Sequence, residues 1–154
     1  MPDLLDGFDR KILRALQEDS SQSNAAVADT VGLSPSPCWR RIQKLERGGF
    51  IKRRVAVVDP NKIGLNTQIY ALVTLNAHGR SNLEEFAASI QEFPEVLDCC
   101  LLMGSFDYVL RVRTDSIAAY EQFLYTTLSQ LPGVQSINSM VTLSEIKSTT
   151  ALPI

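Results

Sequence analysis

Residues 33–54 carry the side chains best suited to chemistry in this chain, and the chemistry is contact with a polyanion. Seven Lys and Arg residues and a single Glu lie between Arg40 and Arg54. Hydroxyl and cationic side chains recur there at helical spacing, at Ser36, Arg40, Lys44 and Arg47. A short helix that presents such a face suits a groove lined with phosphates.

The same stretch carries signals for the start, the buried face and the end of a helix. Ser34 is a good N-cap residue, and Pro35 fits the first helical position. An apolar stripe lies on the other side and consists of Cys38, Ile42 and Leu45. Glycines at 48 and 49 end the pattern. The sequence therefore predicts an amphipathic helix with its cations in solvent.

The neighbouring segments favour a DNA-binding arrangement over an ordinary solvated cationic face. A first helix is predicted from Asp6 to about residue 19, and a second helix is capped by Ser23 and stopped by Gly32. Helix, glycine turn and basic helix is the order of a helix-turn-helix. Residues 50–58 alternate like a strand and carry Lys52, Arg53 and Arg54, which predicts a basic wing. The alternative, a cationic face without a ligand, stays open at this point.

Charge is divided unevenly along the 154 residues. Residues 1–60 carry ten Lys and Arg against eight Asp and Glu, whereas residues 61–154 carry five against nine. This asymmetry indicates a nucleic-acid module joined to a different module, with a turn-rich linker over residues 59–66.

No stretch approaches the length of a membrane span. The three cysteines fit no paired framework, and we interpret all three as reduced core thiols of a cytoplasmic protein.

The second half predicts a sheet with two helices. Strands are expected over residues 68–76, 96–103, 106–113 and 134–146, with helices over 81–93 and 115–131. Strand-helix-strand repeated twice is the ferredoxin-like βαββαβ order. Two helices cover one face only, so the other face would expose apolar side chains, and we expect a homodimer to cover it.

Catalysis finds little support in the residues. The only histidine is His78, in a predicted loop, and no His, Cys and carboxylate cluster has metal-ligand spacing. We expect no catalytic residue, no metal site and no enzyme activity.

Several motifs together resemble the Lrp/AsnC (leucine-responsive/asparagine regulator) family of transcription factors over nearly the whole chain. They include VGLSPSPC at residues 31–38, GFI at 49–51, GSFDY at 104–108 and LPGV at 131–134. The resemblance implies an α+β fold with a winged helix-turn-helix domain over residues 5–66, including its linker and the motif at 24–43. A ferredoxin-like (RAM-type) domain over residues 67–154 would bind effectors and oligomerise, as a dimer that assembles to an octamer.

On this reading, the DNA-binding residues are expected to be Ser34, Ser36, Trp39, Arg40, Arg41, Lys44, Lys52, Arg53 and Arg54. The expected partner is double-stranded DNA with a site of two-fold symmetry. Arg and Ser side chains can hydrogen-bond to its base edges, whereas Lys44, Lys52, Arg53 and Arg54 suit contacts to phosphates. Trp39 is equally suited to packing between helices. The family usually has Gly-Tyr where this chain has Arg53 and Arg54, which makes the predicted wing more basic.

The effector site is expected at the loop Gly104, Ser105, Phe106, Asp107 and Tyr108, joined by Ser136, Asn138 and Ser139 of a neighbouring subunit, which the resemblance implies. Gly104 would let an amino-acid ligand approach the backbone closely. The amides of the turn would bind the ligand's carboxylate, and Asp107 or loop carbonyls would bind its ammonium group. Met103 and Ser105 replace the family's hydroxyl and acidic residues. The alternative is a hairpin turn that binds no ligand, in which Asp107 caps its own backbone.

The sequence therefore predicts a sequence-specific transcriptional regulator whose DNA affinity or oligomeric state responds to an amino-acid-like effector, with no other cofactor. Two alternatives remain: an effector-independent architectural (nucleoid-type) DNA-binding protein, and a small ferredoxin-like enzyme with an accessory DNA domain.

Overall fold

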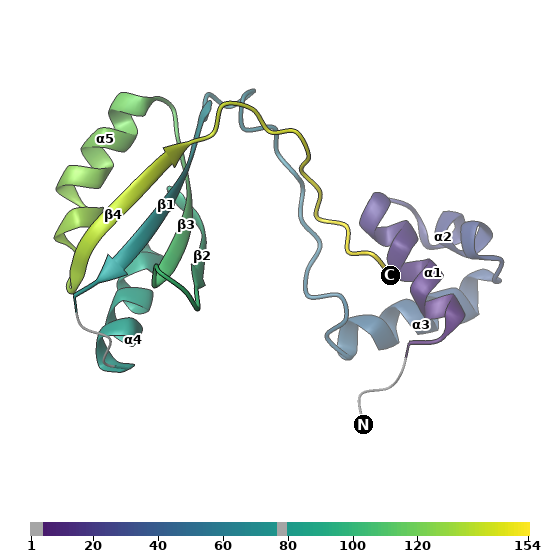
Figure 1. Cartoon of the computed structure of the whole chain (residues 1–154). Coiled ribbons are helices and arrows are strands. Elements are labelled where there is room, and N and C mark those ends of the chain that lie inside the picture. The colour runs from purple at the N-terminus through teal and green to yellow at the C-terminus, as the bar shows by residue number, and fades with distance from the viewer. Residues whose placement is uncertain (1–4, 77–79) are drawn as a thin grey trace. The chain divides into compact units, whose positions relative to one another are not determined.

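The structure is a computed structural model that describes residues 5–76 and 80–154, and it divides into two compact units (Figure 1). The first unit contains the described residues up to Val57 together with Lys147–Ile154, and the second contains Val58–Ile146. Residues 147–154 pack with the first unit, although they follow the strands of the second. His78 lies outside the described residues.

Three helices form the first unit: α1 (Gly7–Glu18), α2 (Asn24–Val31) and α3 (Pro35–Arg47). Asp6 caps α1 through a capping box, in which its carboxylate accepts from the Asp9 N–H at 2.9 Å. Ser23 caps α2, and Gly32 ends it in the left-handed region with φ of 76°. These caps confirm the helix starts and the turn between α2 and α3.

A small hydrophobic core holds the three helices together. It consists of fully or nearly fully buried side chains from all three, namely Ile12, Leu13, Ala15, Leu16, Val27, Ala28, Val31, Cys38, Ile42 and Leu45. The three members from α3 are the apolar stripe predicted from the sequence. Burial of this stripe fixes which side of α3 is left for solvent.

The predicted strand over residues 50–58 is wrong. The chain there is irregular and exposed, and no strand occurs among residues 50–66. Val55, Val57 and Val58 point apolar side chains into solvent. A strand needs a partner to satisfy its backbone groups, and this segment has none in the sheet. Residues 50–58 therefore form no strand with the sheet of the same chain.

The second unit is a four-stranded antiparallel sheet in the order β2-β3-β1-β4, which confirms the ferredoxin-like prediction. The strands are β1 (Thr67–Leu75), β2 (Val96–Leu101), β3 (Tyr108–Thr114) and β4 (Val134–Val141). The helices are α4 (Arg80–Ser89) and α5 (Ile117–Thr126), each followed by a 3-10 turn, η1 (Ile90–Glu92) or η2 (Leu128–Gln130).

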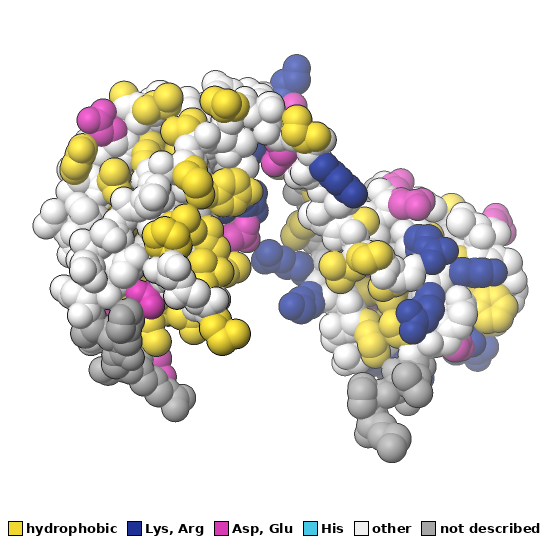
Figure 2. All heavy atoms as spheres, in the orientation of Figure 1, with side chains coloured by type: hydrophobic (Ala, Val, Ile, Leu, Met, Phe, Trp, Pro, Cys, Tyr) yellow, Lys and Arg dark blue, Asp and Glu magenta, His cyan; other side chains and the backbone are white. Residues whose placement is uncertain are grey.

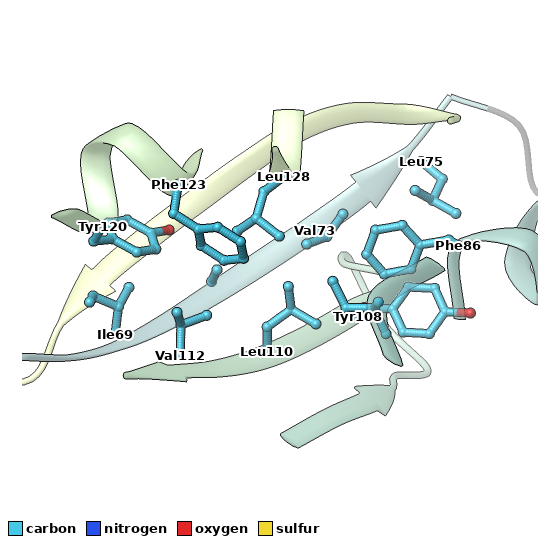
Figure 3. Packing of buried hydrophobic residues seen from close by; sticks show 12 residues of the cluster. Ile69, Val73, Leu75, Phe86, Tyr108, Leu110, Val112, Tyr120, Phe123 and Leu128 are labelled. Carbon is cyan, nitrogen blue, oxygen red and sulfur yellow. The ribbon is translucent and has the colours of Figure 1, made fainter. Parts of the chain in front are cut away.

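One face of this sheet forms the core of the second unit (Figure 3). Alternate β1 residues Ile69, Ala71, Val73 and Leu75 are fully buried beneath the helices. Phe86 of α4 packs against Tyr108 of β3, with ring centroids 4.8 Å apart. Because both helices lie on this side, the intervening residues of each strand form an open face.

The thiols differ in their surroundings. Cys38 is buried in the first core, Cys99 is partly buried, and Cys100 is exposed, so the interpretation of Cys100 as a core thiol is wrong. Burial raises the pKa of Cys99 to about 11, with a further contribution from Cys100.

Within residues 5–76 and 80–154, no helix is long and apolar enough to cross a membrane.

Candidate nucleic-acid interface and effector loop

The solvent side of α3 presents one continuous row of polar and cationic side chains. Its exposed members are Ser36, Trp39, Arg40, Lys44 and Arg47, which share a face at helical spacing. Pro35 begins the helix, and the Ser34 side chain makes no capping hydrogen bond. Figure 2 shows Lys and Arg side chains gathered over the three-helix unit. This exposed row can reach base edges and phosphates together.

Trp39 belongs to this row. The side chain is 52% exposed, so it does not fill the space between helices. That exposure removes one of the two roles that the sequence had left open. The indole lies beside Arg40 and contributes an apolar ring and an N–H donor to the same surface.

An open groove of about 360 Å³ lies at the start of α3 and is lined by Asn24, Pro35, Ser36, Trp39 and Arg40. Asn24 is the one member that the sequence analysis did not single out. Its side-chain Nδ2 donates to the Pro35 carbonyl at 2.9 Å, which ties the start of α2 to the start of α3. An Asn at the first position of a helix after a Ser cap is the only sequence signal for this role.

Arg41 lies on the inner side of α3 and is not part of the exposed row. Its Nη1 donates to Asp6 at 2.6 Å and to Asp9 at 2.7 Å, and its guanidinium lies 5.5 Å from the centroid of the Phe8 ring. Arg41 therefore lies apart from the exposed row, contrary to the DNA contact that the sequence predicts for it. The physical reason is that Arg41 is one position from the buried Ile42 and faces the acidic start of α1.

The electrostatics of this cluster follow from its hydrogen bonds. The pKa of Asp6 is lowered, first by the hydrogen bond from the Asp9 N–H and then by Arg41. The pKa of Arg41 is raised, mainly by its hydrogen bond to Asp9. Both shifts favour the charged forms, so the cluster is an ion pair at neutral pH.

The three basic residues after α3 divide into two kinds. Lys52 and Arg53 are exposed on irregular chain. Arg54 instead reaches back, donating to Glu46 at 3.1 Å and to the Ser20 carbonyl at 3.3 Å. Arg54 therefore links the segment after α3 to the three-helix unit. These hydrogen bonds compete with the contact to a DNA phosphate that the sequence predicts for Arg54.

The loop before β3 is held by Asp107. The Asp107 carboxylate accepts from the Leu75 N–H at 2.7 Å, and the Asp107 N–H donates to the Val73 carbonyl at 2.9 Å. The Leu102 N–H closes the turn by donating to the Asp107 carbonyl at 2.7 Å. The Asp107 carboxylate thus joins the loop to the end of β1, whereas the hairpin alternative expected it to cap the backbone of its own turn.

Tyr108 is a core residue. Its side chain is 4% exposed, and its hydroxyl donates to the Leu83 carbonyl at 2.9 Å. Burial raises the pKa of Tyr108. Gly104 and Ser105 are exposed, Phe106 is half-buried, and Met103 is fully exposed. Of the five predicted loop residues, Gly104 and Ser105 are therefore the most accessible to a ligand.

The three predicted residues of β4 do not share a face. Asn138 pairs with Leu72 and Ser136 with Thr74, so both lie on the open face of the sheet. Ser139 pairs with the buried Ala71, and its hydroxyl is 2.5 Å from the Tyr120 hydroxyl of α5. The alternation of a strand thus places Ser139 on the helix side, away from Ser136 and Asn138.

Within the described part of the chain, no group of three or more His, Cys, Asp and Glu side chains is arranged to hold a metal ion.

Comparisons with known proteins match both units. The family model for the Lrp/AsnC ligand binding domain matches residues 68–152, and a winged helix-turn-helix DNA-binding model matches residues 5–52. The leucine-responsive regulatory protein of Salmonella typhimurium is 38% identical over 150 residues, which cover 97% of this chain and 92% of that protein. The Escherichia coli K12 protein of the same name is 37% identical with the same coverage.

Solved structures agree over nearly the whole chain. A transcriptional regulator of Neisseria meningitidis, in complex with L-Met, superposes with a TM-score of 0.93 at 39% identity and 97% coverage of both chains. An AsnC family transcriptional regulator of Agrobacterium tumefaciens gives a TM-score of 0.91 at 42% identity and 96% coverage of both chains.

Proposed function

The chain belongs to the Lrp/AsnC family of transcriptional regulators, and from that premise we propose that the exposed row on α3 reads its DNA site while an amino acid bound by the sheet unit tunes that binding. The expected effect of the amino acid is a population shift between states that differ in DNA affinity or assembly. No catalytic step is needed for this function.

The observation that carries the DNA proposal is the separation of two kinds of arginine on α3. Arg40 is exposed beside Ser36 and Trp39, whereas Arg41 is held by Asp6 and Asp9. Arg40 can donate to acceptors on a guanine edge, and Ser36 can bond either kind of edge. Lys44, Lys52 and Arg53 lie on the exposed surface and suit phosphates.

For the effector, we propose an α-amino acid with an apolar side chain. The related Neisseria meningitidis regulator was solved with L-Met, and the curated relatives are named for leucine. Gly104 and Ser105 offer exposed backbone and a hydroxyl for the polar end of such a ligand. Ser136 and Asn138, on the open sheet face, are the β4 residues that remain candidates for a site shared between subunits.

We propose a homodimer formed through the open face of the sheet. Tyr70 of β1 and Met140 of β4 are paired there and are 37% and 50% exposed. The ion pair between Arg111 and Asp98, at 2.5 Å, lies on the same face. Figure 2 shows hydrophobic side chains gathered over the sheet unit. A dimer presents two copies of α3, which suits a DNA site of two-fold symmetry, and further assembly to an octamer extends the same proposal.

Selection from a random duplex library tests this function. The wild-type protein should enrich a motif with two-fold symmetry, and adding L-methionine or L-leucine should change its affinity for that motif. A thermal-shift panel of the common amino acids provides the matched binding measurement. Enrichment of no motif would contradict the DNA proposal, and a lack of response to every amino acid would contradict the effector proposal in favour of an architectural role.

A further inference from the structure

The segment after β4 returns to the three-helix unit and docks on α1. Residues Lys147–Ile154 belong to that unit, although β4 belongs to the other one. Figure 1 shows this segment in yellow, ending beside α1. No pattern in the sequence had separated these residues from the sheet domain.

Polar contacts hold the docked segment by its backbone. The Gln17 side chain makes two hydrogen bonds to one residue: its Oε1 accepts from the Leu152 N–H at 2.6 Å, and its Nε2 donates to the Leu152 carbonyl at 3.2 Å. Arg14, one turn earlier on α1, donates to the Ile154 carbonyl. The Ala151 N–H donates to the Thr149 hydroxyl at 3.1 Å, just before the docked residues.

An apolar contact completes the docking. Ile154 is half-buried and packs against the core cluster of the three-helix unit. The Leu152 side chain, by contrast, is 70% exposed, so that residue is held through its main chain. One amide side chain that satisfies both backbone groups of a single residue is a specific arrangement, because its oxygen must face the N–H and its nitrogen must face the carbonyl.

The docking changes how the DNA-binding unit is connected. The unit is joined to the sheet unit by residues that follow α3, and the docked segment makes a second connection that ends on α1. We propose that residues 149–154 act as a strap: their docking on Arg14, Gln17 and the core limits the independent motion of the three-helix unit and couples it to the sheet unit. A domain held at two points has fewer accessible orientations than one held by a single linker.

The coupling part of this proposal rests on the proposed function. The strap follows β4, the strand that carries Ser136 and Asn138, after residues 142–148. A change in β4 on effector binding would therefore reach α1 through the strap as well as through the linker. Release of the strap should leave DNA binding in place and weaken the effect of the amino acid on it.

Trp39 allows a direct test that needs neither DNA nor effector. It is the only tryptophan, and it lies on α3 in the three-helix unit, so its fluorescence anisotropy decay reports motion of that unit. Gln17→Ala removes both hydrogen bonds to Leu152, and Ile154→Ala removes the apolar contact from the other side. Leu152→Ala is the matched control, because it alters the same segment but keeps the main-chain contacts.

Both release variants should add a faster component to the anisotropy decay, whereas Leu152→Ala should decay like the wild type. Far-ultraviolet circular dichroism and thermal melting confirm that each variant is folded. If both release variants are folded and decay like the wild type, the strap is overturned. The same conclusion follows if the wild type already shows the fast component.

A second experiment tests the coupling with L-methionine as the probe. For the selected duplex, the ratio of affinities with and without L-methionine should move toward unity in Gln17→Ala and stay at the wild-type value in Leu152→Ala. An unchanged ratio together with altered anisotropy would overturn the coupling and leave the docking. Failure of the wild type to select any duplex would contradict the proposed function, and the anisotropy would still decide the strap.

Discussion

Arg41 of α3 donates a hydrogen bond to Asp9 of α1 at 2.7 Å, and Asp9 is itself 7% exposed. The same guanidinium nitrogen also reaches Asp6, the N-cap of α1. An arginine in the middle of α3 thus joins two helices, while its neighbour Arg40 is exposed to solvent. This contact adds a polar link between α1 and α3 to the apolar core that orients the exposed row.

Arg41→Ala should lower the free energy of unfolding by about 1–3 kcal/mol, because it leaves the nearly buried Asp9 carboxylate without its charged partner. Chemical denaturation of the full chain measures the change, with Arg40→Ala as the matched control that leaves stability within about 0.5 kcal/mol. Equal stability of Arg41→Ala and the wild type would contradict the positioning role.

Asp6→Asn should make the stability gap to the wild type depend on pH. The pKa of Asp6 is lowered in the folded chain, so ionisation of Asp6 stabilises the fold above its ordinary pKa. This contribution should be constant near neutral pH and disappear as the pH falls below about 4, through the folded pKa. Denaturation of both proteins across this range measures it. A gap that persists at the acid end, or that changes near neutral pH, contradicts the assignment.

The helices were predictable because their ends are coded locally. Asp6, Ser23 and Gly32 are short-range signals, and each acts within one turn of its own helix. The partners of Arg41 and Gln17 were not predictable in the same way. Arg41 meets residues 32 and 35 positions away, and Gln17 meets a residue 135 positions away, and periodicity within one helix carries no information on such pairs.

Gly104→Ala should separate ligand binding from folding. A Cβ at Gly104 would have no atom within 4 Å, and the residue does not adopt positive φ, so stability should change by no more than about 0.5 kcal/mol. If an amino acid approaches this backbone, the added methyl group should weaken its binding. Thermal melting and calorimetry with L-methionine measure the two effects. Unchanged binding would place the effector elsewhere.

Tyr120→Phe should lower stability by about 0.5–1.5 kcal/mol through loss of the hydrogen bond to Ser139. It should leave amino-acid affinity unchanged, because this pair lies on the helix side of the sheet. Ser139→Ala should give the same pattern, and Asn138→Ala is the comparison on the open face. A loss of ligand affinity in Ser139→Ala without a loss of stability would return Ser139 to the effector site.

The candidate sites were predicted in part for a similar physical reason. Spacing identified the exposed row of α3, because one helix determines which of its residues share a face. At the effector loop, spacing could not show that Asp107 holds the end of β1 or that Tyr108 packs on Phe86. Nor could it show the face of Ser139, which depends on the register between β1 and β4.

The exposed row of α3 is the surface that we propose reads DNA sequence. The most direct measurement compares the affinities of the wild type and Arg40→Ala for the selected duplex and for a random duplex of equal length and salt. Arg40→Ala should lose about 1–3 kcal/mol on the selected duplex and clearly less on the random one. Equal losses on both duplexes, or no loss on either, would contradict the claim.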